Sequence, residues 1–126
     1  MTYLLDTAFL IDFLRGDPGA VARLGALVEG GAALLVNDVV VCELFTGSRR
    51  DPDPELAALL EPLEFIQPGL ATAALAGRWR RTALQSGRTL SLADALIAAA
   101  SFESGATVLS RNARDLALTP VAVESY

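Results

Sequence analysis

The chain has 126 residues, of which ten are basic and fifteen acidic, and 52% are hydrophobic, so its formal net charge is −5. This length fits one domain, residues 1–126, and this hydrophobicity excludes a disordered chain. The sequence contains no His and no Lys, so all ten basic residues are Arg. Their absence excludes Ser-His-Asp and Cys-His triads, phosphate-binding loops that require a Lys, and zinc sites built on His.

Strands and helices are expected to alternate along the chain. The apolar patterns and their Pro and Gly boundaries predict strands at 2–5, 32–36, 63–66 and 106–109, with a fifth at 121–123. Helices are expected at 7–14, 18–29, 37–45, 55–60, 68–87 and 91–104. This alternation predicts an α/β fold whose parallel sheet has four to five strands and carries helices on both faces.

The chain offers no targeting or disulfide signal. No apolar run approaches the ~18 residues that span a bilayer, and the segment 1–6 lacks a basic region, so we expect a cytoplasmic protein. The only cysteine, Cys42, lies in an apolar segment and is expected to be a small core residue. The acidic balance argues mildly against nucleic-acid binding, but the arginines are clustered at 49–50, 78–88 and 111–114.

Four acidic residues lie within or next to apolar runs, namely Asp6, Glu43, Asp94 and Asp115. A carboxylate in such a place is unfavourable unless it is paired or bound to a cation. Ligands bind at the carboxyl ends of parallel strands, and Asp6 and Asp115 follow the first and fourth strands. The four acids therefore suggest one site for Mg²⁺ or Mn²⁺, and metal-assisted phosphodiester hydrolysis needs no His or Lys.

Each acid also has a purely structural explanation. Asp6 is placed to cap the first helix, and Asp94 lies three residues after Ser91, as in a capping box. Asp115 is placed to cap a last helical turn. Glu43 is the hardest to explain this way, because its neighbours at helical spacing are apolar or small, and we favour a functional role for it.

Several other residues are expected near these acids. Thr7 can offer a hydroxyl or a backbone amide, and Ser110 can donate a hydrogen bond to a ligand. Asn112 can bind a hard cation through its amide oxygen, although less strongly than Asp115. Asp12, six residues after Asp6, faces elsewhere on the helix and is expected to be structural, pairing with an arginine. Trp79 is expected to pack in the core or an interface rather than to stack on a base.

Four segments resemble, in order and spacing, the motifs of VapC-type PIN-domain toxins, and together they span nearly the whole chain. They are Leu4-Leu5-Asp6-Thr7-Ala8-Phe9-Leu10-Ile11-Asp12-Phe13-Leu14-Arg15-Gly16, Val41-Cys42-Glu43-Leu44-Phe45-Thr46-Gly47, Leu90-Ser91-Leu92-Ala93-Asp94-Ala95-Leu96-Ile97-Ala98-Ala99-Ala100, and Leu109-Ser110-Arg111-Asn112-Ala113-Arg114-Asp115-Leu116.

The resemblance implies a PIN-domain-like three-layer α/β/α fold and a metal-dependent endoribonuclease, the toxin of a type II toxin–antitoxin pair. Asp6, Glu43 and Asp94 match the core acidic triad of the family. Asn112 stands where some PIN domains carry Asp, and Asp115 matches an acid common in VapC toxins, so one metal or two remains open. The resemblance also implies an RNA substrate, a VapB-type antitoxin that blocks the active site, and a homodimer.

The expected chemistry is hydrolysis by a metal-activated water, with one unassigned carboxylate orienting or deprotonating it. Arg111 and Arg114 are expected to contact flanking phosphates. The first alternative, motivated by Asn112, is a PIN-like module that binds RNA or a partner without cutting. The others are a small-molecule phosphatase and a structural cation site without chemistry.

Overall fold

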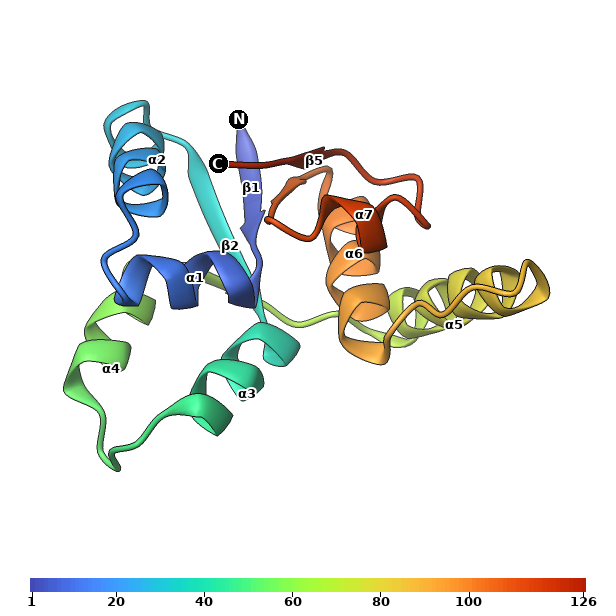
Figure 1. Ribbon diagram of the computed structural model, residues 1–126, viewed down its shortest axis with the longest axis horizontal. Coiled ribbons are helices and arrows are strands. Elements are labelled where there is room, and N and C mark those ends of the chain that lie inside the picture. The colour runs from blue at the N-terminus through green and yellow to red at the C-terminus, as the bar shows by residue number, and fades with distance from the viewer.

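Five parallel strands form the centre of the computed structural model, which describes residues 1–126 (Figure 1). Their order in the sheet is β3-β2-β1-β4-β5, and every neighbouring pair is parallel. The strands are β1 Thr2–Leu5, β2 Ala33–Asn37, β3 Glu64–Ile66, β4 Thr107–Leu109 and β5 Val123–Glu124. The predicted parallel sheet of four to five strands is confirmed, with five.

Helices cover both faces of this sheet. The connections β1–β2 and β2–β3 place α1, α2 and α4 on one face, while the return from β3 to β4 places α5 and α6 on the other, where α7 joins them (Figure 1). The helices are α1 Thr7–Leu14, α2 Pro18–Glu29, α3 Asp38–Gly47, α4 Pro54–Leu60, α5 Leu70–Gln85, α6 Leu92–Ser104 and α7 Ala113–Leu116. None of them combines the length and apolarity needed to cross a membrane.

The element boundaries agree with the predicted ones to within two residues. The first strand and the first two helices begin and end where predicted. The helix predicted from residue 68 begins at Leu70, because the chain stays extended at Gly69 as it crosses from β3 to the opposite face of the sheet. The second strand is shifted by one residue, and the fifth strand is Val123–Glu124 rather than 121–123.

The core lies on both faces of the two central strands. Leu4, Leu5, Val108 and Leu109 are fully buried, and Phe9 of α1 packs against them. Each such side chain stabilises the fold by roughly 1.5–3 kcal/mol. A second, smaller cluster of mostly alanine residues lies between α5 and α6, where small side chains let the two helices approach closely.

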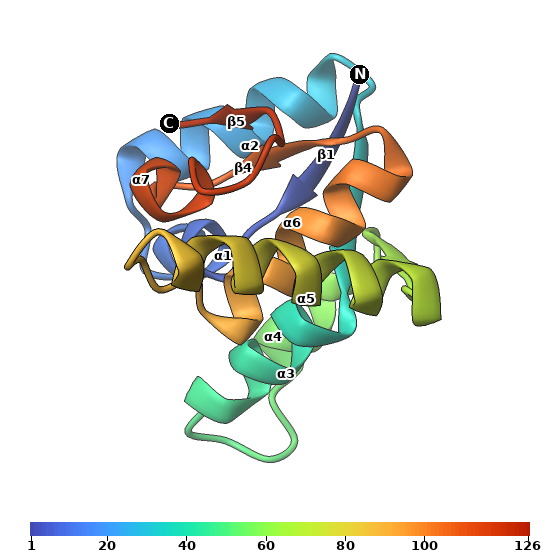
Figure 2. The ribbon, with the colours of Figure 1, turned by 90° about the vertical axis from the view of Figure 1, so that its right-hand side faces the viewer.

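Helix α3 lies beyond the carboxyl end of the sheet (Figure 2), where it contacts α1 and α6. It begins at this place because Asn37, the last residue of β2, accepts a hydrogen bond from the Val40 amide at 3.0 Å. Only Val40 and Leu44 of α3 are buried, so most of its surface faces solvent. The prediction that Cys42 is a core residue is therefore wrong, because Cys42 lies on an exposed face of α3.

Candidate active site

The register of the two central strands places Asp6 beside Ser110. Leu5 pairs with Leu109, and the amide of Asp6 donates to the Leu109 carbonyl at 3.1 Å. After these strands the chain turns to opposite faces of the sheet, which is the position where α/β sheets bind ligands. The hydroxyl of Ser110 donates to Oδ2 of Asp6, as predicted.

Asp6 is also the N-cap of α1, as predicted. Its Oδ1 accepts a hydrogen bond from the Thr7 amide at 2.8 Å, and the side chain is almost entirely buried. Burial raises the pKa of Asp6 and the negative charge of Glu43 adds to the rise, while the hydrogen bonds from Ser110 and Thr7 oppose it. Capping and a site role are therefore compatible in one residue.

Thr7 links α1 to Glu43 on α3. The hydroxyl of Thr7, itself buried, donates to Oε1 of Glu43 at 2.7 Å. The apolar sequence around Glu43 does not bury it, because helical geometry turns Val40 and Leu44 inward and leaves Glu43 exposed toward the start of α1. This contact explains how an exposed glutamate is held beside Asp6.

Asp94 lies half-buried in the first turn of α6, whose N-terminus is at the same end of the sheet. Its amide donates to the hydroxyl of the capping residue Ser91 at 3.0 Å, as the capping-box pattern predicts. Burial raises the pKa of Asp94, and the negative charges of Asp6, Asp115 and Glu43 each raise it further. Carboxylates from three other segments of the chain therefore act on Asp94.

Asn112 and Asp115 differ in their relation to these acids. Asp115 lies inside the single turn of α7, exposed, and acts electrostatically on Asp94. The alternative that Asp115 caps this turn is wrong, because Asn112 occupies the cap position. The amide of Asn112 donates to Ser110 at 2.9 Å, but its side chain makes no hydrogen bond. Of the other three acids, Asp94 is the one on which Asp115 acts.

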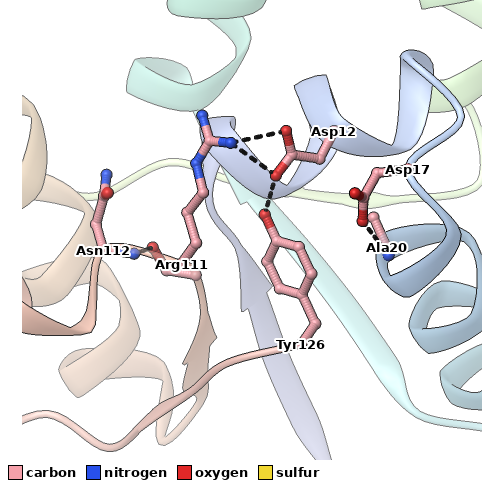
Figure 3. A network of polar contacts seen from close by, with 7 residues as sticks. Asp12, Asp17, Ala20, Arg111, Asn112 and Tyr126 are labelled. Atoms are coloured by element: carbon pink, nitrogen blue, oxygen red, sulfur yellow. Dashed lines mark hydrogen bonds and ion pairs between the residues drawn. The ribbon is translucent and has the colours of Figure 1, made fainter.

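We call the carboxyl end of the sheet, where Asp6, Glu43, Asp94 and Asp115 lie, the acidic edge. Next to it, Asp12 pairs with Arg111, which confirms the prediction that Asp12 pairs with an arginine (Figure 3). The phenol hydroxyl of Tyr126 donates a hydrogen bond to the same carboxylate. The sequence pattern did not single out Tyr126, because no local pattern signals this contact. Arg114 is exposed and forms no ion pair. Trp79 is half-buried and meets Phe102 edge-on at 5.7 Å, in agreement with its predicted packing role.

The acids fit a hard divalent cation in their chemistry. Carboxylate oxygens are the ligands that Mg²⁺ and Mn²⁺ prefer. Burial is the main cause of the raised pKa values of Asp6 and Asp94, and neighbouring negative charges, which a cation would offset, add to both rises. In this conformation no three acidic, His or Cys side chains lie close enough together to hold one ion. Binding therefore requires some of these side chains to rotate toward one another.

Two hollows lie along α3. One, of about 370 Å³, lies between α3 and α6 and has Glu43 and Ala93, the neighbour of Asp94, on its walls. The other, of about 280 Å³, lies further along α1 and α3 and contains Arg15 and Arg49.

The comparisons with known proteins place this chain in one family. The family model of the PIN domain matches residues 3–120. The chain is 33% identical over 120 residues to Ribonuclease VapC19 of Mycobacterium tuberculosis, a match that covers 93% of this chain and 94% of the relative. The chain therefore belongs to the PIN-domain family, within its VapC-type members.

Solved structures agree with this assignment of the fold. A chain in the crystal structure of VapBC2 from Rickettsia felis bound to a DNA fragment from their promoter superposes with a TM-score of 0.85 at 20% identity, covering 100% of this chain and 99% of that one. A chain of VapBC-1 from nontypeable Haemophilus influenzae superposes with a TM-score of 0.84 at 21% identity, covering 99% and 98%. The three-layer PIN fold inferred from the resemblance is confirmed.

Proposed function

We propose that this protein is a metal-dependent endoribonuclease and the toxin of a type II toxin–antitoxin pair. The observation that carries the proposal is that Asp6, Glu43, Asp94 and Asp115 all lie toward the carboxyl end of the sheet, where the charge of Glu43 acts on Asp6 and the charges of the other three act on Asp94. The relative in Mycobacterium tuberculosis is named a ribonuclease, which supports RNA as the substrate.

Asp6, Glu43 and Asp94, assisted by Asp115, would hold Mg²⁺ or Mn²⁺, with the Asn112 amide oxygen as a weaker candidate ligand. When bound, the ion supplies an activated water and offsets charge at the scissile phosphate. Thr7 fixes the orientation of Glu43, and Ser110 fixes that of Asp6. Arg111 and Arg114 would contact phosphates on either side of the cleaved bond.

The decisive experiment is cleavage of a pool of structured cellular RNAs by the purified, antitoxin-free protein with Mg²⁺, Mn²⁺ or EDTA. We expect discrete fragments that require metal and that disappear with Asp94→Asn. Glu103→Gln is the matched control, because it makes the same change at the exposed far end of the same helix. Fragments that persist in EDTA or with Asp94→Asn would contradict the assignment of the site.

A second candidate function is an RNA-binding or partner-binding module that does not cut. It is favoured by Asn112 at a position where some PIN domains carry Asp, and by acids that do not converge in this conformation. It predicts RNA binding that survives EDTA, with no fragments at any metal concentration from folded protein.

We also propose a VapB-type antitoxin as the partner, since the structural neighbours include VapBC complexes. A largely apolar groove of about 560 Å³ between α2 and α4 supports this proposal; it is lined by Phe13, Leu24, Val28, Leu59 and Leu63 among others. Such a groove fits an apolar segment of the antitoxin.

Co-purification with the antitoxin tests this surface. We expect Val28→Asp to weaken the complex, because Val28 is 61% exposed and lines the groove. Val21→Asp, two turns earlier on α2 and outside the groove lining, is the control. Equal retention of the antitoxin by both variants would exclude the groove.

A further inference from the structure

Asp12 is a buried carboxylate that the acidic edge does not use. It lies on α1 and is 9% exposed, and its charge is compensated by residues far away in the sequence (Figure 3). Nη1 of Arg111 donates to both of its oxygens, at 2.9 and 3.0 Å, and the phenol of Tyr126 donates to Oδ2. Burying a charge costs stability unless the charge is paired, so the buried carboxylate of Asp12 depends on these two donors.

Arg111 uses only some of its hydrogen-bond donors to bind Asp12. Its Nε and Nη2 groups make no hydrogen bond within the protein, and its side chain is 54% exposed. A guanidinium presents five donors in a planar fork, so one edge can bind a carboxylate while another binds a phosphate. A lysine ammonium has no such fixed second edge.

Arg111 is linked to Asp6 by its place in the chain and by its charge. Arg111 directly follows Ser110, whose hydroxyl donates to Asp6. Asp12 comes six residues after Asp6 on the same helix, which corresponds to about 9 Å along its axis. The positive charge of Arg111 also acts on Asp6, where it lowers the pKa against the larger effect of burial.

Tyr126 completes the arrangement from a third segment. Its ring packs edge-on against Phe9 of α1 at a centroid distance of 4.8 Å. Burial and the hydrogen bond to Asp12 raise its pKa, so the phenol stays protonated and remains a donor. Arg111 is thereby attached to α1 through Asp12. The phenol of Tyr126 holds Asp12 in place with its own hydrogen bond and leaves the unused donors of Arg111 available to a phosphate.

We propose that Asp12 and Tyr126 are positioning residues that hold Arg111 with one edge of its guanidinium free for a substrate phosphate beside the scissile one. The inference rests on the proposed function in taking RNA as the ligand. The alternative is a purely structural ion pair between α1 and the loop after β4. Such a pair would stabilise the fold without affecting how Arg111 binds RNA.

Binding of a fluorescently labelled single-stranded RNA, measured in EDTA at several salt concentrations, tests the role of Arg111. We expect Arg111→Gln to weaken binding about tenfold and to reduce the slope of log affinity against log salt by roughly 0.7, the value for one phosphate contact on a single strand. Arg23→Gln is the matched control, since Arg23 is the other ion-paired arginine, bound to Glu124 at 3.1 Å. Equal effects of both variants would overturn the inference.

The two positioning residues give a test with an opposite sign. Loss of a negative charge in Asp12→Asn should tighten RNA binding if only net charge matters, whereas loss of positioning weakens it. We expect weaker binding for Asp12→Asn and for the charge-neutral Tyr126→Phe, and no further weakening by either in an Arg111→Gln background. Tighter binding by Asp12→Asn, or equal losses with and without Arg111, would overturn the proposal.

The outcomes separate this inference from the proposed function. In metal-dependent cleavage, Tyr126→Phe should raise KM more than it lowers kcat, and thermal melts should show folded variants. A wild-type protein that cuts no RNA but shows the expected binding differences would contradict the nuclease and leave the role of Arg111 intact. Cleavage by the wild type with unchanged RNA binding by Arg111→Gln would overturn the role of Arg111 alone.

Discussion

Asp6 illustrates how a site residue can oppose the stability of its own fold. The carboxylate is almost entirely buried next to Glu43, and burial raises its pKa above the ordinary value. A carboxyl whose folded-state pKa exceeds that of the unfolded chain favours folding below the unfolded value of about 3.9, and this contribution is lost as the pH rises through the folded-state pKa. Ionised Asp6 therefore destabilises the metal-free protein at neutral pH.

We predict that Asp6→Asn raises the melting temperature of the metal-free protein at neutral pH by a few degrees, since the amide keeps the cap without the charge. The gain should shrink as the pH falls through the folded-state pKa toward ~4, and it should vanish below the unfolded-state pKa of about 3.9, where Asp6 is protonated in both states. Thermal melts in EDTA across this range provide the measurement. A variant less stable than the wild type at neutral pH would contradict the electrostatic argument.

Thr7 is expected to control Glu43, because its hydroxyl is the only side-chain partner of that carboxylate, at 2.7 Å. We predict that Thr7→Val lowers the apparent affinity for Mg²⁺ or Mn²⁺ about tenfold, as for other residues that orient a metal ligand. Thr7→Ser retains the hydroxyl and serves as the control. Metal titrations of cleavage would measure this, and equal affinities in all three proteins would exclude the role.

Among the helices, α6 depends on how it ends as well as on how it begins. Ser91 caps its start and so fixes the turn that carries Asp94. Gly105 ends it with a φ of +66°, a left-handed conformation that favours glycine, and the chain then enters β4. The position of Ser110 and α7 therefore follows from this turn.

We predict that Gly105→Ala lowers the free energy of unfolding by about 1 kcal/mol, because a Cβ meets no atom there but the left-handed backbone disfavours alanine. Gly77→Ala within α5 is the control, since a Cβ is also free of contacts there and alanine should stabilise the helix by about 0.5–1 kcal/mol. Urea denaturation measures both changes. A stabilising Gly105→Ala would contradict this account of the turn.

Across the molecule, most of the arginines have no carboxylate partner. Of the ten arginines, only Arg23 and Arg111 form ion pairs with carboxylates, so eight do not. The net charge of −5 nevertheless repels RNA at long range. Binding should therefore depend on local arginine contacts that displace counterions from phosphates.

We predict that the affinity for RNA falls linearly with salt on logarithmic axes, and that cleavage at subsaturating RNA falls in parallel. Anisotropy measurements between about 50 and 200 mM salt would show this. Affinity that does not change over this range would indicate recognition without phosphate contacts.

The homodimer implied by the family resemblance stays a prediction, which light scattering at two protein concentrations would test.

Local sequence signals were sufficient for most of the elements. Helix α2 begins at Pro18 and ends before the pair Gly30-Gly31, because the backbone preferences of proline and glycine act within a few residues. The candidate acids Asp6, Glu43 and Asp94 could also be selected from the chain alone, because carboxylates in apolar runs are unusual in any fold. Their role as metal ligands stays a prediction.

Exposure and long-range partners could not be obtained in this way. Cys42 and Glu43 lie in an apolar run, yet both face solvent because α3 lies beyond the end of the sheet and buries only one side. The meeting of Asp12 with Arg111 and Tyr126 joins residues about a hundred positions apart and depends on the order and register of β1, β4 and β5. Periodicity and capping act locally, so they specify which segments are helices and strands and which acids are unusual. Strand order acts across the whole chain, and it sets which side chains share the edge of the sheet.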